Sequence, residues 1–166
     1  MLHAHGIRQL MDVRTIPRSR HNPQFGRENL PGSLAAAGIR YEHMPGLGGL
    51  RHAQPGTINT SWRNASFRGF ADYMQTPAFQ DNLQKLLDAA ATAPTAIMCA
   101  EAVPWRCHRS LIGDALVARG IDVRDILSAT QCKPHTLTPF ARVNGTDVTY
   151  PGEGGQEAEN LNLKFD

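Results

Sequence analysis

The chain has 166 residues, 41% of them hydrophobic, which fits one domain with a substantial core. It contains no apolar run of membrane-spanning length, no signal-peptide pattern at its start, and only three cysteines. These features argue against a membrane protein and against a secreted disulfide framework. We therefore expect a cytoplasmic protein with reduced thiols.

The formal net charge of +2 conceals an uneven distribution of charge. Residues 1–70 contain nine arginines and only three acidic residues, a net charge of +6. The planar guanidinium group suits phosphate and carboxylate partners. A high-GC genome, which favours arginine codons, explains the excess equally well. The composition thus indicates an anionic small molecule or a nucleic acid as partner without choosing between them.

Apolar periodicity predicts short elements in the first half of the chain. They are a helix over 1–6 that ends at Gly6, a strand over 7–13, a helix over 30–37, a strand over 39–44 and a loop over 45–66. A helix at residue 1 normally follows a strand in this kind of fold. We expect the opening strand to be missing, which would leave a sheet edge open to another copy of the chain. A simple N-terminal helix is the equal alternative.

In the second half, Thr76 and Pro77 have the pattern of an N-cap followed by a first-turn proline. The remaining predicted elements are a helix over 67–74, the helix that Thr76 caps, a strand over 95–99, a helix over 107–119 and a last strand over 121–127. Alternating strands and helices predict a single α/β domain over 1–150, with a mainly parallel sheet flanked by helices. Residues 151–166 read as a polar, mobile tail.

The stretch from Cys99 to Arg109 is the strongest functional signal. It holds two thiols, a carboxylate, an imidazole and two guanidinium groups between a predicted strand and a predicted helix. Open α/β sheets place ligand sites at the carboxyl ends of their strands, and helix N-termini favour anions and thiolates. This segment therefore predicts chemistry or specific binding.

Cys107 is the first candidate nucleophile. In the first turn of a helix beside His108 and Arg109, its thiol would have a pKa lowered by positive charge and by the helix dipole. It could act as a nucleophile, a redox thiol or a metal ligand; the alternative is a small, packed cysteine. Cys99 and Glu101 would share one face of a continuing strand. Glu101 then serves as general base or arginine partner, or the two are a core cysteine and a structural carboxylate.

Two ligand chemistries can be examined by counting residues. A phosphatase-like loop needs five residues between its cysteine and its arginine. Counted from Cys99, the arginine would stand at position 105, which is Trp105. The residues Cys99, Glu101, Cys107 and His108 could supply metal ligands. The spacing from Cys99 to Cys107 is too long for one zinc knuckle, and adjacent Cys107 and His108 should point differently. A metal site is therefore the less favoured alternative, and we assign no metal and no cofactor.

Polar residues also follow the first two predicted strands, at the same edge of the sheet as the cysteines. Arg14 and Arg18, followed by Ser19, suit an anionic substrate, with Asp12 orienting a guanidinium or taking a proton. The alternative of equal weight is an Asp12–arginine salt bridge that ties the loop. Four further candidates come from the second strand and the turn after it: Tyr41, His43, Gly48 and Gly49. The glycines allow close backbone approach or only a tight turn.

These motifs resemble a known family, the domain-of-unknown-function family number 488. The segments that carry the resemblance are Met11–Ser19, Tyr41 with His43, Leu47–Gly49, Phe70–Met74, Cys99 with Glu101, and Cys107–Arg109. The resemblance covers roughly residues 6–127 and implies the fold and the constellation, but no established reaction. Family members usually open with a strand and helix that this chain lacks, and their last strand commonly has a histidine where this chain has Asp125.

Three functional hypotheses follow. The first is a thiol-dependent enzyme whose anion-binding cleft uses Cys107, with Cys99, Glu101, His108 and Asp12 around it. The second is a nucleic-acid-associated binding module that uses the basic first half, although aromatic residues for base stacking are sparse. The third is an inactive, truncated family member.

Overall fold

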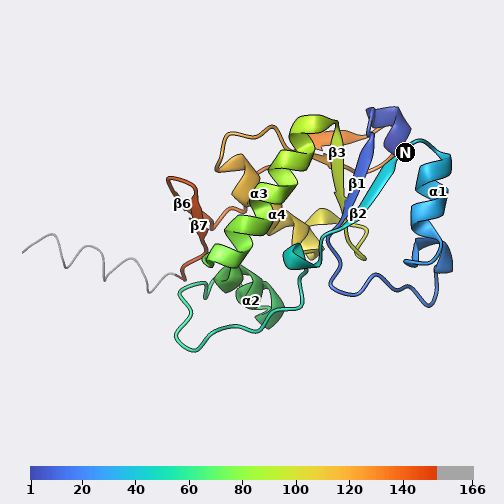
Figure 1. Cartoon of the computed structure of the whole chain (residues 1–166). Helices are drawn as coiled ribbons and strands as arrows, with labels where there is room; N and C mark the ends of the chain where they lie inside the picture. The colour runs from blue at the N-terminus through green and yellow to red at the C-terminus, as the bar shows by residue number, and fades with distance from the viewer. Residues whose placement is uncertain (153–166) are drawn as a thin grey trace, which may run out of the picture.

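The computed structural model describes residues 1–152 and contains a parallel sheet at its centre. The strands are β1 (Gln9–Asp12), β2 (Arg40–His43) and β3 (Thr95–Met98), in the order β2-β1-β3 (Figure 1). The α/β class and the parallel sheet are thus confirmed. The predicted tail, 151–166, falls almost wholly outside the described residues.

Helices cover both faces of this sheet because the side chains of β1 alternate between them. Leu10 packs with Leu34 beneath α1 (Leu30–Ala36), whereas Met11 faces a larger core. That core is built by α2 (Ala65–Met74), α3 (Pro77–Thr92) and α4 (Arg109–Val117), on the opposite side from α1 (Figure 1). No helix within residues 1–152 is both long enough and apolar enough to cross a membrane.

Capping residues set several helix boundaries. The Thr76 hydroxyl accepts a hydrogen bond from the Phe79 N–H at 3.3 Å, and Pro77 opens α3, as predicted. Helix α2 starts two residues earlier than predicted because the Asn64 side chain caps it. Four 3-10 helices complete this part of the fold: Leu2–His5, Pro23–Phe25, Pro45–Leu47 and Pro104–Arg106. Gly6 ends the first of them with φ of 69°.

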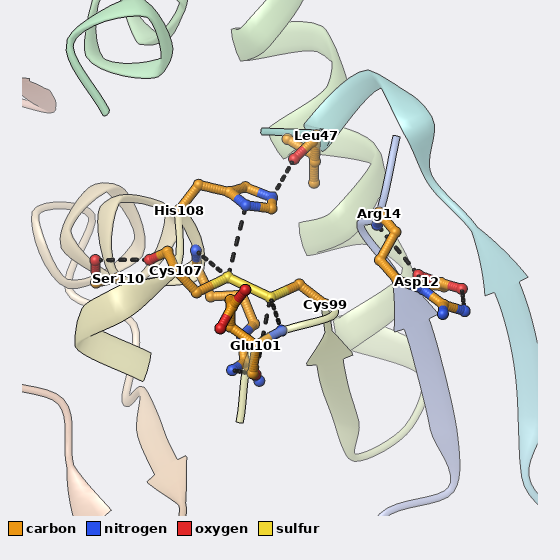
Figure 2. The surroundings of a disulfide bond; sticks show 9 residues. Asp12, Arg14, Leu47, Cys99, Glu101, Cys107, His108 and Ser110 are labelled. Atoms are coloured by element: carbon orange, nitrogen blue, oxygen red, sulfur yellow. Dashed lines mark hydrogen bonds and ion pairs between the residues drawn. A yellow bond between two sulfur atoms is a disulfide. The ribbon is translucent and has the colours of Figure 1, made fainter. Parts of the chain in front are cut away.

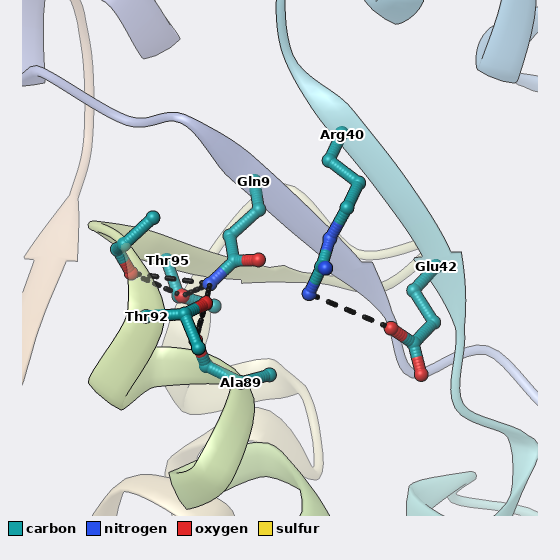
Figure 3. Close-up of polar contacts among 7 residues, drawn as sticks. Gln9, Arg40, Glu42, Ala89, Thr92 and Thr95 are labelled. Atoms are coloured by element: carbon teal, nitrogen blue, oxygen red, sulfur yellow. Dashed lines mark hydrogen bonds and ion pairs between the residues drawn. The ribbon is translucent and has the colours of Figure 1, made fainter.

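Gln9 fixes the position of β3 against β1. Its buried amide nitrogen donates to the Ala89 carbonyl at 2.5 Å and to the Thr95 hydroxyl at 2.6 Å (Figure 3). The first contact holds the end of α3, and the second holds the start of β3. By contrast, Arg40 and Glu42 on edge strand β2 form an exposed ion pair at 3.8 Å (Figure 3). The buried contacts therefore position the strand that leads into Cys99.

The prediction of a last parallel strand over 121–127 is wrong. Strand β4 (Arg124–Ile126) pairs antiparallel with β5 (Cys132–Pro134), outside the three-stranded sheet. The chain reverses between them, and the Leu127 N–H donates to the Gln131 carbonyl at 2.9 Å. A second hairpin that the sequence analysis missed follows, with β6 (Arg142–Asn144) and β7 (Asp147–Thr149).

Candidate functional site

The two cysteines of the predicted site lie at the carboxyl edge of the sheet and are bonded to each other. Cys99 directly follows β3, Cys107 precedes α4, and a disulfide joins them (Figure 2). The expectation of reduced thiols is therefore wrong for this pair, while Cys132 is free. The segment from 99 to 107 folds back through the 3-10 helix at Pro104, so it returns Cys107 to the end of β3. Periodicity cannot reveal such a return.

The backbone at the start of α4 contacts the Cys107 sulfur. His108 is the N-cap residue, so Cys107 lies just before the helix instead of in its first turn, as we had predicted. The Arg109 N–H still points at Cys107 Sγ from 3.5 Å, and the Ser110 hydroxyl donates to the Cys107 carbonyl at 3.0 Å. Cys107 is buried, with 4% of its surface exposed, whereas Cys99 is half-buried.

The His108 ring is held with one nitrogen facing the sulfurs (Figure 2). Its Nε2 lies 3.0 Å from the Leu47 carbonyl oxygen, and its Nδ1 lies 3.6 Å from Cys107 Sγ. Because a carbonyl oxygen only accepts hydrogen bonds, Nε2 carries the proton and Nδ1 offers its lone pair to the sulfur. The prediction that adjacent Cys107 and His108 point differently is wrong.

Close packing locks this ring in place. A side-chain carbon on Gly49 would lie 2.5 Å from His108 Nδ1, and the Phe70 ring centroid is 5.0 Å from the imidazole. Burial lowers the pKa of His108 to about 4, against weaker opposing effects of backbone hydrogen bonds. His108 is therefore neutral near pH 7 and does not supply the positive charge that we expected from it beside Cys107.

Glu101 and Arg109 surround Cys99 in an irregular loop. Strand β3 ends at Met98, so the predicted continuation that would place Cys99 and Glu101 on one strand face is wrong. Glu101 is exposed, and its backbone N–H lies 3.3 Å from Cys99 Sγ. The Arg109 guanidinium donates to the Glu101 carbonyl oxygen at 2.5 Å. Burial lowers the pKa of Arg109, while Asp125 and Glu101 oppose that shift.

Asp12 and Arg14 form a closed ion pair at the end of β1. Arg14 Nε donates to Asp12 at 2.8 Å, and the Tyr41 hydroxyl donates to Asp12 at 2.7 Å. Asp12 is 0% and Arg14 6% exposed. Burial alone would raise the pKa of Asp12, but the hydrogen bonds from Arg14 and Tyr41 outweigh it and lower that pKa. Burial, aided by the bond to Asp12, raises the pKa of Tyr41 to about 12. These groups satisfy one another, which corresponds to the salt-bridge alternative.

The other predicted binding residues are dispersed. His43 Nε2 donates to the Arg14 carbonyl at 2.8 Å, Arg18 is exposed, and Ser19 accepts from the Asn22 N–H at 3.1 Å. Gly48 packs closely on Thr15, and Gly49 packs closely on His108. The space beside each glycine is therefore filled by another side chain of this protein. Figure 2 shows Asp12 and Arg14 apart from the disulfide. Within residues 1–152, no hydrogen bond or ion pair joins these two groups.

A buried cluster on α4 escaped the sequence analysis. Asp114 is 0% exposed and accepts hydrogen bonds from the Tyr150 hydroxyl at 2.8 Å and from His135 Nε2 at 3.1 Å. His135 Nδ1 lies 3.1 Å from Asp125. The bond to Asp114 raises the pKa of His135, burial opposes that shift, and the bond to Asp125 supports it. A lone aspartate within the apolar run of α4 was the signal that could have revealed this cluster.

The fold and the site define a class: an α/β domain with a cysteine pair and a histidine at the carboxyl edge of a parallel sheet. The model of the family "Domain of unknown function DUF488" matches residues 1–116, and the chain belongs to that family. This confirms the resemblance seen in the sequence. Comparisons with curated proteins and with solved structures gave no match.

Proposed function

We propose that this protein is a thiol-dependent enzyme that exchanges a dithiol for a disulfide with a small anionic substrate. The supporting observation is the bond between Cys99 and Cys107 at the edge of the sheet where α/β folds bind ligands. Two cysteines that form a disulfide can take up two electrons on reduction and release them on oxidation, without a cofactor. Cys132, in β5, takes no part in this bond.

Burial assigns different roles to the two sulfurs. Cys99 is the more exposed residue and is the one that meets the substrate. Cys107 is buried beside the Arg109 N–H, which stabilises its thiolate, and beside His108 Nδ1, which accepts a hydrogen bond from its thiol. A stabilised thiolate is also a good leaving group. Cys107 is therefore the internal nucleophile in one direction and the leaving group in the other.

The reaction balances as two exchanges. The Cys99 thiolate attacks a substrate disulfide, forms a mixed disulfide and expels one substrate thiolate. Cys107 then loses its proton to solvent, attacks Cys99 Sγ and expels the second substrate thiolate. The protein dithiol is oxidised to a disulfide, and the substrate disulfide is reduced to two thiols. We assign Glu101, which is exposed two residues after Cys99, to contact with the departing substrate.

Exposed arginines that lie close to the site residues in the sequence favour an anionic substrate. Arg106 is exposed one residue before Cys107, and Arg18 is exposed beyond β1. The buried Arg14 already pairs with Asp12, so it supports the loop and leaves substrate binding to the exposed guanidinium groups.

Exchange with two disulfides of opposite charge tests this proposal. Reduced protein, kept in a metal chelator, is mixed with oxidised glutathione or with cystamine, and labelled products are identified by mass spectrometry. We expect faster exchange with glutathione, loss of this preference in Arg106→Ala, and a mixed disulfide trapped on Cys99 in Cys107→Ser. Cys132→Ser serves as the matched control and should behave like the wild type. Exchange at Cys99 and Cys107 no faster than at Cys132 would show an inactive family member.

Nucleic-acid binding is the second candidate function, favoured by the exposure of arginines in the first half of the chain. Arg8, Arg20, Arg27 and Arg40 are all exposed. Binding of a labelled oligonucleotide that weakens steeply with salt would support this function. Binding that is absent at low salt would exclude it.

A cytoplasmic location and self-association through an open sheet edge likewise stay predictions.

A further inference from the structure

We infer that the reduced centre is a metal site, in which Cys99, Cys107 and His108 bind one thiophilic divalent cation of the Zn²⁺ type. Their ligand atoms, two Sγ and one ring nitrogen of His108, all lie within 4.8 Å of one another. Two thiolates and one imidazole are a ligand set that zinc prefers. This inference goes beyond disulfide exchange, because it requires only that the pair be reduced.

The distance between Cys107 and His108 fits a tetrahedral ion. Zinc binds sulfur at about 2.3 Å and nitrogen at about 2.0–2.1 Å, so tetrahedral angles place these two ligands about 3.6 Å apart. Cys107 Sγ and His108 Nδ1 are 3.6 Å apart in the structure. This ligand edge therefore needs no rearrangement of the helix start.

Reduction of the disulfide allows the third ligand, Cys99, to move. The sulfurs of a zinc-bound cysteine pair lie about 3.8 Å apart, so Cys99 must separate from Cys107 once their bond is broken. The two Cα atoms are 7.5 Å apart, so the two side chains reach toward each other across a wide backbone spacing. The backbone spacing thus leaves room for an ion between the side chains after reduction.

The surroundings of the three ligands resemble an outer coordination shell. Metal-bound histidines usually donate their second ring N–H to a carbonyl or carboxylate, and His108 Nε2 already donates to the Leu47 carbonyl. The backbone N–H groups of Glu101 and Arg109 point at the two sulfurs, from 3.3 and 3.5 Å. Such contacts favour the thiolate form that a metal needs.

Three protein ligands leave a fourth position for water or a substrate. This count is typical of catalytic zinc sites, whereas structural sites use four protein ligands. The adjacent Glu101 side chain is exposed, so the site faces solvent on the side of Cys99. The metal form and the disulfide form exclude each other, because both use the same sulfur electrons.

Cobalt binding tests the inference directly. Anaerobically reduced full-length protein is titrated with Co²⁺, whose thiolate charge-transfer absorption reports sulfur ligands, and Zn²⁺ is then added as competitor. We expect one Co²⁺ per chain, displaced by Zn²⁺, and no such absorption from the disulfide form. Cys99→Ser and Cys107→Ser should abolish or strongly reduce the absorption. His108→Ala should weaken binding by at least the roughly 10–100-fold that loss of an outer-shell partner costs.

Two matched controls keep the result interpretable. Cys132→Ser and His52→Ala, which change a free cysteine and an exposed histidine, should bind Co²⁺ like the wild type. Absence of thiolate absorption in the reduced wild type, or its loss in Cys132→Ser, would overturn the inference. Because exchange is measured in chelator and metal binding without any disulfide, failure of one leaves the other standing.

Discussion

Two histidines pack against α4, and their surroundings shift their pKa values in opposite directions. His108 caps the helix with its ring against Gly49, and His135 lies against Gly113 further along. Both side chains are largely or wholly enclosed, but His108 meets a carbonyl oxygen and a sulfur, whereas His135 lies between two carboxylates. Burial alone therefore does not decide the protonation state of a histidine. The acceptors around the ring decide it.

The comparison separates a reactive site from a structural one. Neutral His108 has an unshared electron pair facing two sulfurs, which suits a hydrogen-bond acceptor or a metal ligand. The raised pKa of His135 favours its protonated form, in which the two nitrogens donate to Asp114 and Asp125 and neither nitrogen is free. We assign His135 to holding β5 against α4 and His108 to chemistry.

The largest effect should come from removing the carboxylate that holds His135. Asp114→Asn leaves a buried imidazolium with one partner fewer and disturbs the bond from Tyr150. Removing one member of a buried ion pair costs about 3–5 kcal/mol of folding free energy. Urea unfolding at pH 6 measures the loss.

The matched control for Asp114 is Asp122→Asn. Its carboxylate is 72% exposed and pairs with Arg124 at the surface, where such pairs contribute only about 0–1 kcal/mol. Equal losses in Asp114→Asn and Asp122→Asn would contradict a buried, charged cluster around His135.

The second effect is a pair of opposite pH dependences. His108 has a folded pKa of about 4, so between that value and about 6.5 the unfolded chain binds a proton that the folded chain does not. Stability should fall by roughly 3 kcal/mol as the pH drops through this window. His135 has a raised folded pKa, so its contribution is complete below about 6.5 and is lost as the pH rises through the folded value.

Unfolding of the disulfide form in chelator, measured across this range, separates the two histidines. His108→Ala should flatten the acid side of the stability curve, and His135→Gln the alkaline side. A wild-type acid slope that persists in His108→Ala would show that other groups cause it.

The third effect concerns the glycines beneath the two rings. A side-chain carbon at Gly49 would lie 2.5 Å from His108 Nδ1, and one at Gly113 would lie 2.7 Å from His135 Nε2. Overpacking of this kind costs about 1–3 kcal/mol. We therefore expect Gly49→Ala and Gly113→Ala to lower the free energy of unfolding in calorimetry or urea titration.

Gly32→Ala is the control for these substitutions. Nothing lies within 4 Å of a carbon added at Gly32, which sits in α1. Removing a helical glycine there should raise stability by roughly 0.5–1 kcal/mol. If Gly49→Ala gained stability as Gly32→Ala does, the His108 ring would not be held as described.

Local signals in the sequence predicted the elements that local chemistry determines. Thr76 and Pro77 start α3, Gly6 ends the first turn, and apolar periodicity located β1, β2 and β3. The same reasoning placed Cys99 and Cys107 near one sheet edge, because strand ends and helix starts meet there.

Contacts between distant residues could not be predicted in this way. Strand β4 has only three residues, and its partner β5 is chosen by a turn that no periodicity marks. The pairing of Arg14 with Asp12 depends on burial, which removed Arg14 from the group of free anion-binding residues. The tautomer of His108 depends on the Leu47 carbonyl, which belongs to a loop 61 residues away in the chain.

The most direct test of the central claim is site-resolved thiol labelling of the native protein, followed by intact-mass and peptide analysis. Our account predicts that Cys132 alone is labelled before reduction, that all three cysteines become available after reduction, and that added oxidised glutathione restores the bond between Cys99 and Cys107. Labelling of Cys99 and Cys107 without prior reduction, together with no re-formation of their bond in oxidised glutathione, would contradict it.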